Sequence, residues 1–127
     1  MRFLIDTHIF LWHIDGNPKL NQNVAAVIED PENNIYLSIG SIWEITLKVS
    51  KGKLPGHHSI LNLKEYLAKS KFEILQISFS HLEQIEILKS IHGDPFDRLI
   101  VAQAISEKLV LITDDEVMKQ YPADFLK

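Results

Sequence analysis

The chain has 127 residues, of which 46% are hydrophobic and 24% are charged, and this is enough to form one hydrophobic core. It contains no cysteine, which excludes disulfides, thiolate metal sites and cysteine nucleophiles, and which fits a cytoplasmic location. The formal net charge of -4 argues against broad, non-specific binding to nucleic acid or to anionic lipid. We expect a single domain over residues 1–127.

The N-terminal stretch MRFLIDTHIFLWHI is apolar but is interrupted by Arg2, Asp6 and His8. It lacks the continuous apolar segment and the small-residue cleavage site of a signal peptide, and it is too short and too charged to span a bilayer. We therefore expect no membrane partner.

Short apolar segments alternate with segments of helical periodicity along the chain. In chain order they predict a strand at 2–5, a helix at 21–30, a strand at 34–38, a helix at 39–52 that stops at Gly52, a helix at 59–70, a strand at 72–78, helices at 80–91 and 95–108, a strand at 109–113 and a short helix at 115–121. Short apolar strands that alternate with helices favour an α/β fold with a mainly parallel sheet covered on both faces.

Acidic residues follow two of the predicted strands directly. Asp6 follows the strand at 2–5, and Asp114 and Asp115 follow the strand at 109–113. In open α/β sheets, ligands bind at the carboxyl ends of the strands, so these acids are candidates for a site. The alternative is that each one is an ordinary N-cap between a strand and a helix.

Two further acids lie in the segment HGDPFDRLIVAQA. Asp94 precedes Pro95, the residue type preferred at the first helical position, and so has the place of an N-cap. Asp97 is then the third helical residue, where a negative charge faces the positive end of the helix dipole. Its short side chain reaches back to the cap amide less readily than Glu or Gln would, which indicates a second role for Asp97.

Glu44 lies in the body of a predicted helix, where capping does not explain it. Its neighbours Ile42, Trp43 and Ile45 are expected to be largely buried, and a charged group is seldom buried without a partner. The alternative is an exposed ion pair with Lys48 at the i+4 spacing.

If these acids converge, their mutual repulsion requires protonation or a cation. Oxygen ligands that leave room for water suit Mg²⁺ or Mn²⁺. Such ions activate water and stabilise the charge that develops on a phosphodiester, so the pattern indicates phosphodiester hydrolysis.

Four motifs, LIDTHIFLW, SIGSIWEITLKVSKGKL, DPFDRLIVAQA and LITDD, resemble in their order and spacing the PIN domain nucleases, and most closely the VapC-type toxins of bacterial toxin–antitoxin pairs. The resemblance covers almost the whole chain. It implies a three-layer α/β/α sandwich around a mainly parallel sheet and a ribonuclease that uses Mg²⁺ or Mn²⁺. It also implies an RNA substrate, a cognate antitoxin protein and a homodimer.

The resemblance also assigns residues. It implies that the catalytic and metal-binding acids are Asp6, Glu44, Asp97 and Asp115, and that the supporting residues are Thr7, Ser41, Thr113 and Asp114. The family usually places a Thr or Ser, one intervening residue and then Asp after its penultimate strand, which favours Asp115 with Thr113 as the supporting hydroxyl, although the doubled Asp leaves Asp114 open. Asp94 belongs to a DPFDR variant and is kept as a cap or an outer group.

Basic residues near these acids are weaker candidates for RNA contact. Lys48, Lys51 and Lys53 form a small basic strip beside Glu44, which is either an RNA contact or a solvated helix end. Arg98, next to Asp97, could pair with a carboxylate or with a phosphate.

The six histidines do not indicate a zinc enzyme. His8 and His13 are not spaced to share a helical face, the chain has no HExxH motif, and His57 and His58 lie in a predicted loop. A haloacid-dehalogenase-like phosphatase needs a second Asp where this chain has His8. The remaining alternative is a catalytically silent PIN-like module that binds RNA or protein, although its signature, the loss of an acid, is not found.

Overall fold

The computed structural model describes residues 1–91 and 93–126, and within these ranges four strands form one parallel sheet. The strands are β1 (Arg2–Ile5), β2 (Asn34–Ser38), β3 (Glu73–Leu75) and β4 (Val110–Ile112), in the order β3-β2-β1-β4. All three pairings are parallel. The predicted α/β class with a parallel sheet is confirmed.

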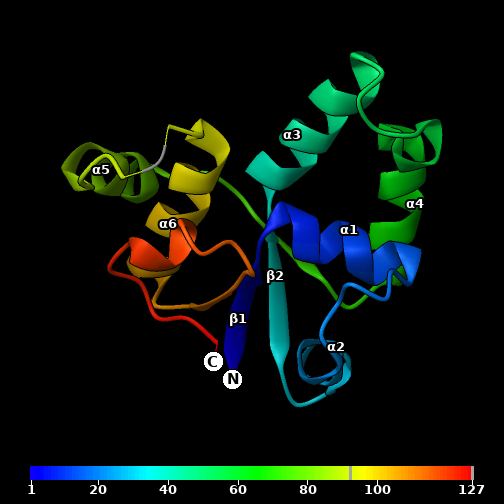
Figure 1. Ribbon diagram of the computed structural model, residues 1–127, viewed down its shortest axis with the longest axis horizontal. Helices are drawn as coiled ribbons and strands as arrows, with labels where there is room; N and C mark the ends of the chain where they lie inside the picture. Colours follow the sequence, from blue (N-terminus) through cyan, green and yellow to red (C-terminus); the bar gives the residue numbers. More distant parts are fainter. Residues whose placement is uncertain (92, 127) are drawn as a thin grey trace.

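Helices cover both faces of the sheet, as Figure 1 shows, with α5 and α6 on one side and the first four helices on the other. Their bounds are α1 (Thr7–Asp15), α2 (Gln22–Glu29), α3 (Ile39–Ser50), α4 (Ile60–Lys69), α5 (Phe79–Ile87) and α6 (Pro95–Glu107), with short 3₁₀ turns η1 (Gly56–His58) and η2 (Met118–Gln120). None of the helices in the described part of the chain has the length and hydrophobicity needed to cross a bilayer.

The alternation of side chains along the strands divides the core into two layers. Phe3 and Ile5 of β1 point to the face covered by α1 to α4, where they pack with residues such as Phe10 and Ile45. Leu4, between them, points to the opposite face and joins a cluster formed mainly by α6 and β4. Because both faces are buried, the strands are apolar at successive positions.

Helix α1 is not among the helices that the sequence predicts. Its three buried apolar residues Ile9, Phe10 and Leu11 are consecutive, so they do not show the spacing by which a helix is recognised. Its ends are nevertheless typical: Asp6 caps the first turn, and Gly16 ends the helix in the left-handed conformation, with φ of 61°.

Several predicted bounds also differ from the structure. Strand β3 covers Glu73–Leu75, not 72–78, and α5 ends at Ile87 and not at residue 91. The helix predicted at 115–121 is wrong, since only a 3₁₀ turn at Met118–Gln120 forms there. The expected domain of residues 1–127 also includes positions 92 and 127, which lie outside the described residues.

Candidate active site

The carboxyl ends of β1 and β4 lie side by side at the point where the strand order of the sheet reverses. From β1 the chain moves to β2 and β3 on one side and then crosses to β4 on the other side of β1. Ligands of open α/β sheets bind at such a switch point. Asp6 and Thr113 are the residues that follow these two strands, and the Asp6 amide donates to the carbonyl of Ile112 at 3.1 Å.

Asp6 is buried at this edge, with 3% of its surface exposed. Its Oδ1 accepts a hydrogen bond from the Ile9 amide at 2.8 Å, so the N-cap alternative is correct for one oxygen. The other oxygen, Oδ2, accepts from the Thr113 hydroxyl. Burial raises the pKa of Asp6 to about 6, and the hydrogen bonds from Thr113 and Ile9 only partly oppose this effect. A nearby cation would favour the ionised form.

Glu44 is also buried, with 4% exposure, although it lies in the middle of α3. Its Oε1 accepts from the Thr7 hydroxyl at 2.8 Å, and its Oε2 pairs with Lys48 Nζ at 2.8 Å. The Lys48 pair expected as the alternative therefore forms, but with a buried carboxylate and not on an exposed surface. Thr7 Oγ1 also lies 2.9 Å from the hydroxyl oxygen of Ser41, so the two predicted supporting residues contact each other beside Glu44.

Asp94 is the N-cap of α6, as predicted. Its Oδ1 accepts from the amides of Phe96 at 2.8 Å and of Asp97 at 3.2 Å, and Pro95 is the first helical residue. Asp97 is the third residue of α6 and is partly buried. The start of α6 lies against α3, because the ring of Phe96 packs edge-on against Trp43 with centroids 5.0 Å apart.

Asp114 and Asp115 differ in their surroundings. The Thr113 hydroxyl oxygen accepts from the Asp115 amide at 3.0 Å, and Asp115 Oδ1 accepts from the amide of Val117 at 2.9 Å. Asp114 is exposed, and its charge contributes to the raised pKa of Asp6. One oxygen of Asp115 therefore stabilises the following turn, whereas Asp114 acts on Asp6 electrostatically, and both stay candidates for the fourth acid.

The predicted acids do not form a tight cluster. Among residues 1–91 and 93–126, no three of them bring carboxylate oxygens within 4.8 Å of one another. The donors at this edge are nevertheless all oxygens, two of the carboxylates are buried, and hydroxyls hold them in place. Such residues fit Mg²⁺ or Mn²⁺, because these ions keep several waters and contact only one or two carboxylates directly.

A cavity of about 290 Å³ lies beside Glu44. It is lined by Glu44, Leu47, Lys48, Lys51, Lys53, Asp94, Pro95 and Phe96. The basic strip therefore faces an open space next to a predicted site acid. Arg98 has a different position: its Nη2 donates to the carbonyls of Ile85 at 3.2 Å and Leu88 at 3.5 Å, at the end of α5. We therefore leave Arg98 out of the proposed RNA contacts.

Trp43 was expected to be buried, and this expectation is wrong, since 55% of its surface is exposed. It lies next to Glu44 in the chain and contacts Phe96 of α6. The sequence does not predict this exposure, because Trp43 lies between apolar residues. The orientation of α3 decides which of these residues faces the solvent.

The comparisons with known proteins agree with this architecture. A family model described as PIN domain matches residues 3–124. VapBC2 from Rickettsia felis, bound to a DNA fragment from its promoter, has a similar structure (TM-score 0.76, 24% identity, 99% of this chain and 98% of that chain). VapBC-1 from nontypeable Haemophilus influenzae is also similar (TM-score 0.69, 18% identity, 100% of this chain and 98% of that chain). So is a toxin–antitoxin complex from Klebsiella pneumoniae (TM-score 0.65, 23% identity, 98% of this chain and 96% of that chain). A comparison with curated protein sequences gives no match.

Proposed function

The chain belongs to the PIN domain family, and from this premise we propose that it is a nuclease that hydrolyses RNA phosphodiesters with Mg²⁺ or Mn²⁺. The observation that carries the proposal is the pair of buried carboxylates, Asp6 and Glu44, beside the switch point of the sheet. Burial of two acids is costly, and functional sites are where such costs are tolerated. Thr7, which follows Asp6, binds Glu44 and so connects the two positions.

The proposed ligands of the ion are Asp6, Glu44, Asp97 and one of Asp114 and Asp115. A divalent ion bound there supplies a Lewis acid for the phosphodiester and makes water more acidic. The residues of the chain orient these groups. Thr113 holds Oδ2 of Asp6, while Thr7 and Lys48 each hold one oxygen of Glu44, so neither carboxylate is free to rotate.

The surface beside Glu44 is the proposed path of the RNA. Lys51 and Lys53 line the cavity there and would contact phosphates, while Lys48 already pairs with Glu44. The exposed ring of Trp43 offers a surface on which an unpaired base can stack. These features favour single-stranded RNA as the substrate, because a base must be unstacked from its neighbours to reach an aromatic ring.

We further propose that the protein is a single-domain, cytoplasmic toxin that a cognate antitoxin protein inhibits, and that it forms a homodimer. The support is the likeness to three complexes described as VapBC or as toxin and antitoxin, which match this chain over nearly its whole length. Their TM-scores of 0.65 to 0.76 show the shared fold at sequence identities of 18 to 24%, and the partner is inferred from this likeness.

The test is cleavage of a mixed pool of single-stranded RNA by the purified chain with Mg²⁺, with Mn²⁺ and with a chelator. We expect cleavage that depends on the metal and that is lost in Asp6→Asn and in Glu44→Gln. Asp30→Asn is the matched control, because Asp30 is an exposed aspartate whose side chain caps a local turn, and it should cleave like the wild type. Absence of cleavage under all conditions, with RNA binding retained, would favour the silent binding module.

A further inference from the structure

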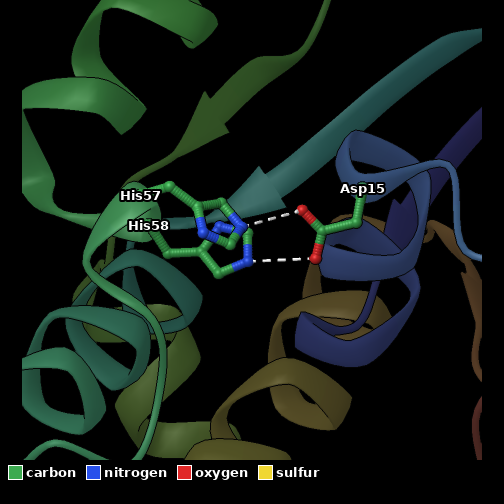
Figure 2. A group of neighbouring side chains, drawn as sticks. All are labelled: Asp15, His57 and His58. Atoms are coloured by element: carbon green, nitrogen blue, oxygen red, sulfur yellow. Dashed lines mark hydrogen bonds and ion pairs between the residues drawn. The ribbon is translucent and has the colours of Figure 1, made fainter.

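A second group of potential ligands lies at the other end of α1 from Asp6. Figure 2 shows the imidazoles of His57 and His58 side by side, both directed at the carboxylate of Asp15. The Nε2 atom of His57 lies 3.3 Å from Oδ1 of Asp15, and the Nε2 atom of His58 lies 3.0 Å from Oδ2. From the sequence alone, the two histidines are expected in a loop, and no metal site is predicted there.

These atoms lie close enough together to bind one metal ion. One nitrogen of each histidine and one carboxylate oxygen lie within 4.8 Å of one another. Ligands at 2.0–2.1 Å from a tetrahedral zinc ion are separated from each other by about 3.3 Å. The observed nitrogen-to-oxygen separations, 3.3 Å from His57 to Oδ1 and 3.0 Å from His58 to Oδ2, are close to that value, so an ion could enter after side-chain movements that bring both nitrogens and the carboxylate around it.

An ordinary ion pair does not account for this arrangement well. Each imidazole contacts its own oxygen of Asp15, but the ring centroids are only 4.0 Å apart, so two protonated rings would repel each other. A metal ion removes this conflict, because it binds both imidazoles in their neutral form and keeps the carboxylate charge compensated. We propose that Asp15, His57 and His58 form a binding site for Zn²⁺.

The surroundings hold these side chains in place. The His58 side chain is buried, with 3% exposure, whereas those of Asp15 and His57 are 38% and 61% exposed, so an ion can enter from the solvent side. Asn62 of α4 donates its amide to the carbonyl of His57 at 3.1 Å and so fixes the turn. A cavity of about 220 Å³, which Leu63 and Tyr66 also line, adjoins the group and leaves a fourth position for water.

Zinc suits these donors better than the ions proposed for the acidic edge. Imidazole nitrogen favours Zn²⁺ and its neighbours in the first transition row, whereas Mg²⁺ prefers oxygen ligands. The two sites are also separate: α1 has nine residues, which corresponds to a length of roughly 13 Å, and Asp6 and Asp15 lie at its opposite ends. That distance is too long for the paired ions of a two-metal centre.

The bound ion would connect two parts of the fold that are distant in sequence. Asp15 ends α1, while His57 and His58 lie in η1, between α3 and α4. A zinc ion would therefore fix the connection between α3 and α4 to α1, and it would stabilise the folded chain by binding that state alone.

The experiment is a zinc titration of the tag-free, full-length chain against a chromophoric chelator, together with thermal unfolding in zinc and in magnesium. We expect the wild type to bind zinc at this site and to unfold at a higher temperature when zinc is present. His57→Asn, at an exposed position that should not disturb folding, is expected to weaken this binding by about 100-fold or more, since loss of even an outer-shell partner costs 10 to 100-fold. Asp15→Asn should have the same effect.

Two controls separate this site from the acidic edge. Asp6→Asn alters the acidic edge, and His8→Asn removes an exposed histidine at the start of the same helix. Both are expected to keep the zinc affinity and the zinc-induced rise in the unfolding temperature. If the wild type takes up no zinc at micromolar concentrations, the proposal is wrong. It is equally wrong if His57→Asn binds zinc as the wild type does, or if Asp6→Asn abolishes the binding. None of these outcomes depends on whether the chain cleaves RNA.

Discussion

Thr113 donates its hydroxyl hydrogen to Oδ2 of Asp6, although the two residues are 107 positions apart in the sequence. This bond joins the end of β4 to the end of β1, at the switch point of the sheet. With Ile9 bonded to the other oxygen, the carboxylate of Asp6 is held at both oxygens inside the protein. Its pKa is nevertheless raised to about 6, because the loss of hydration outweighs the hydrogen bonds.

The first prediction concerns the pH dependence of stability without metal. The pKa of Asp6 is about 6 in the folded chain against an ordinary 3.8, so the folded state binds more protons than the unfolded state between these values. The free energy of unfolding should therefore fall as the pH rises from below 4 to above 6, by about 3 kcal/mol for this group. Denaturant unfolding of the wild type and of Asp6→Asn over this range measures the effect.

In Asp6→Asn, the contribution of this carboxyl group to the pH dependence of the free energy of unfolding disappears. The variant should match the wild type near pH 4 and should be more stable than it at pH 8, since no buried charge remains and Asn is an equally good cap. Asp30→Asn, at an exposed site, should follow the wild type throughout. If the difference between Asp6→Asn and the wild type is the same at pH 4 and pH 8, the assigned pKa of Asp6 is wrong.

The second prediction concerns the hydroxyl of Thr7, which binds the buried carboxylate of Glu44 at 2.8 Å. Replacement of Thr7 with Val keeps the shape of the side chain but removes this hydrogen bond. Because hydrogen bonds to charged groups contribute about 1.5–3 kcal/mol, Thr7→Val should lower the free energy of unfolding by about 2 kcal/mol. Thr7→Ser keeps the hydroxyl and should restore most of this loss, as chemical denaturation would show. If Thr7→Val keeps the stability of the wild type while Thr7→Ser loses it, the methyl group of Thr7, and not its hydroxyl, stabilises the chain.

The sequence predicts a residue's role well where that role depends only on residues close to it in the chain. Asp94 was predicted as an N-cap because its role needs only the next three residues, and the structure confirms it. The covering of both faces of the sheet follows in the same way from the consecutive apolar residues of β1. Contacts between distant segments had no such signal: nothing in the motif around Glu44 indicates that Thr7 binds it, or that Trp43 is exposed.

The group of Asp15, His57 and His58 shows the same limit. Adjacent histidines are visible in the sequence, but Asp15 precedes them by more than forty residues, and α1, which places it, was not predicted. The sequence does not predict this helix because its buried apolar residues are consecutive, so only the packed fold shows which face of α1 is inside.

The third prediction tests the contact between α3 and α6 that places the start of α6 beside Glu44. A Cβ atom added to Gly40 would lie 2.5 Å from Cδ2 of Leu99, which is too close for two carbon atoms that are not bonded to each other. Gly40→Ala should therefore destabilise the chain by about 1–3 kcal/mol, the usual cost of an overpacked core, even though Ala is the better helix former.

Leu99→Ala removes the side chain that would clash, and alone it should cost about 2–5 kcal/mol because it leaves a cavity. The double variant Gly40→Ala with Leu99→Ala should lose less stability than the two single variants added together, because each change relieves the effect of the other. Thermal or chemical unfolding of the four proteins gives the coupling energy. Strict additivity would show that the helices move apart and that Leu99 does not fix their separation.

The last prediction separates Asp94 from Asp97, which lie in one turn of α6 but are assigned different roles. Asp94 accepts from the amides of Phe96 and Asp97, and an Asn side chain can accept the same bonds. Asp94→Asn should therefore keep both the stability and the RNA cleavage of the wild type within experimental error. Asp97→Asn removes a negative charge from the proposed metal site, so cleavage at saturating Mg²⁺ should fall by at least about 100-fold.

Stability distinguishes this effect from damage to the helix. Asp97 is the third residue of α6, where its charge favours the helix dipole by only about 0.3–1 kcal/mol, so Asp97→Asn should remain folded and unfold within a few degrees of the wild type without metal. The measurements are cleavage of a mixed RNA pool and melting curves for both variants. Equal loss of cleavage in the two would place Asp94 in the site and overturn the division of roles. Full activity in Asp97→Asn would exclude its carboxylate as a metal ligand, because an amide oxygen carries no charge to compensate the ion.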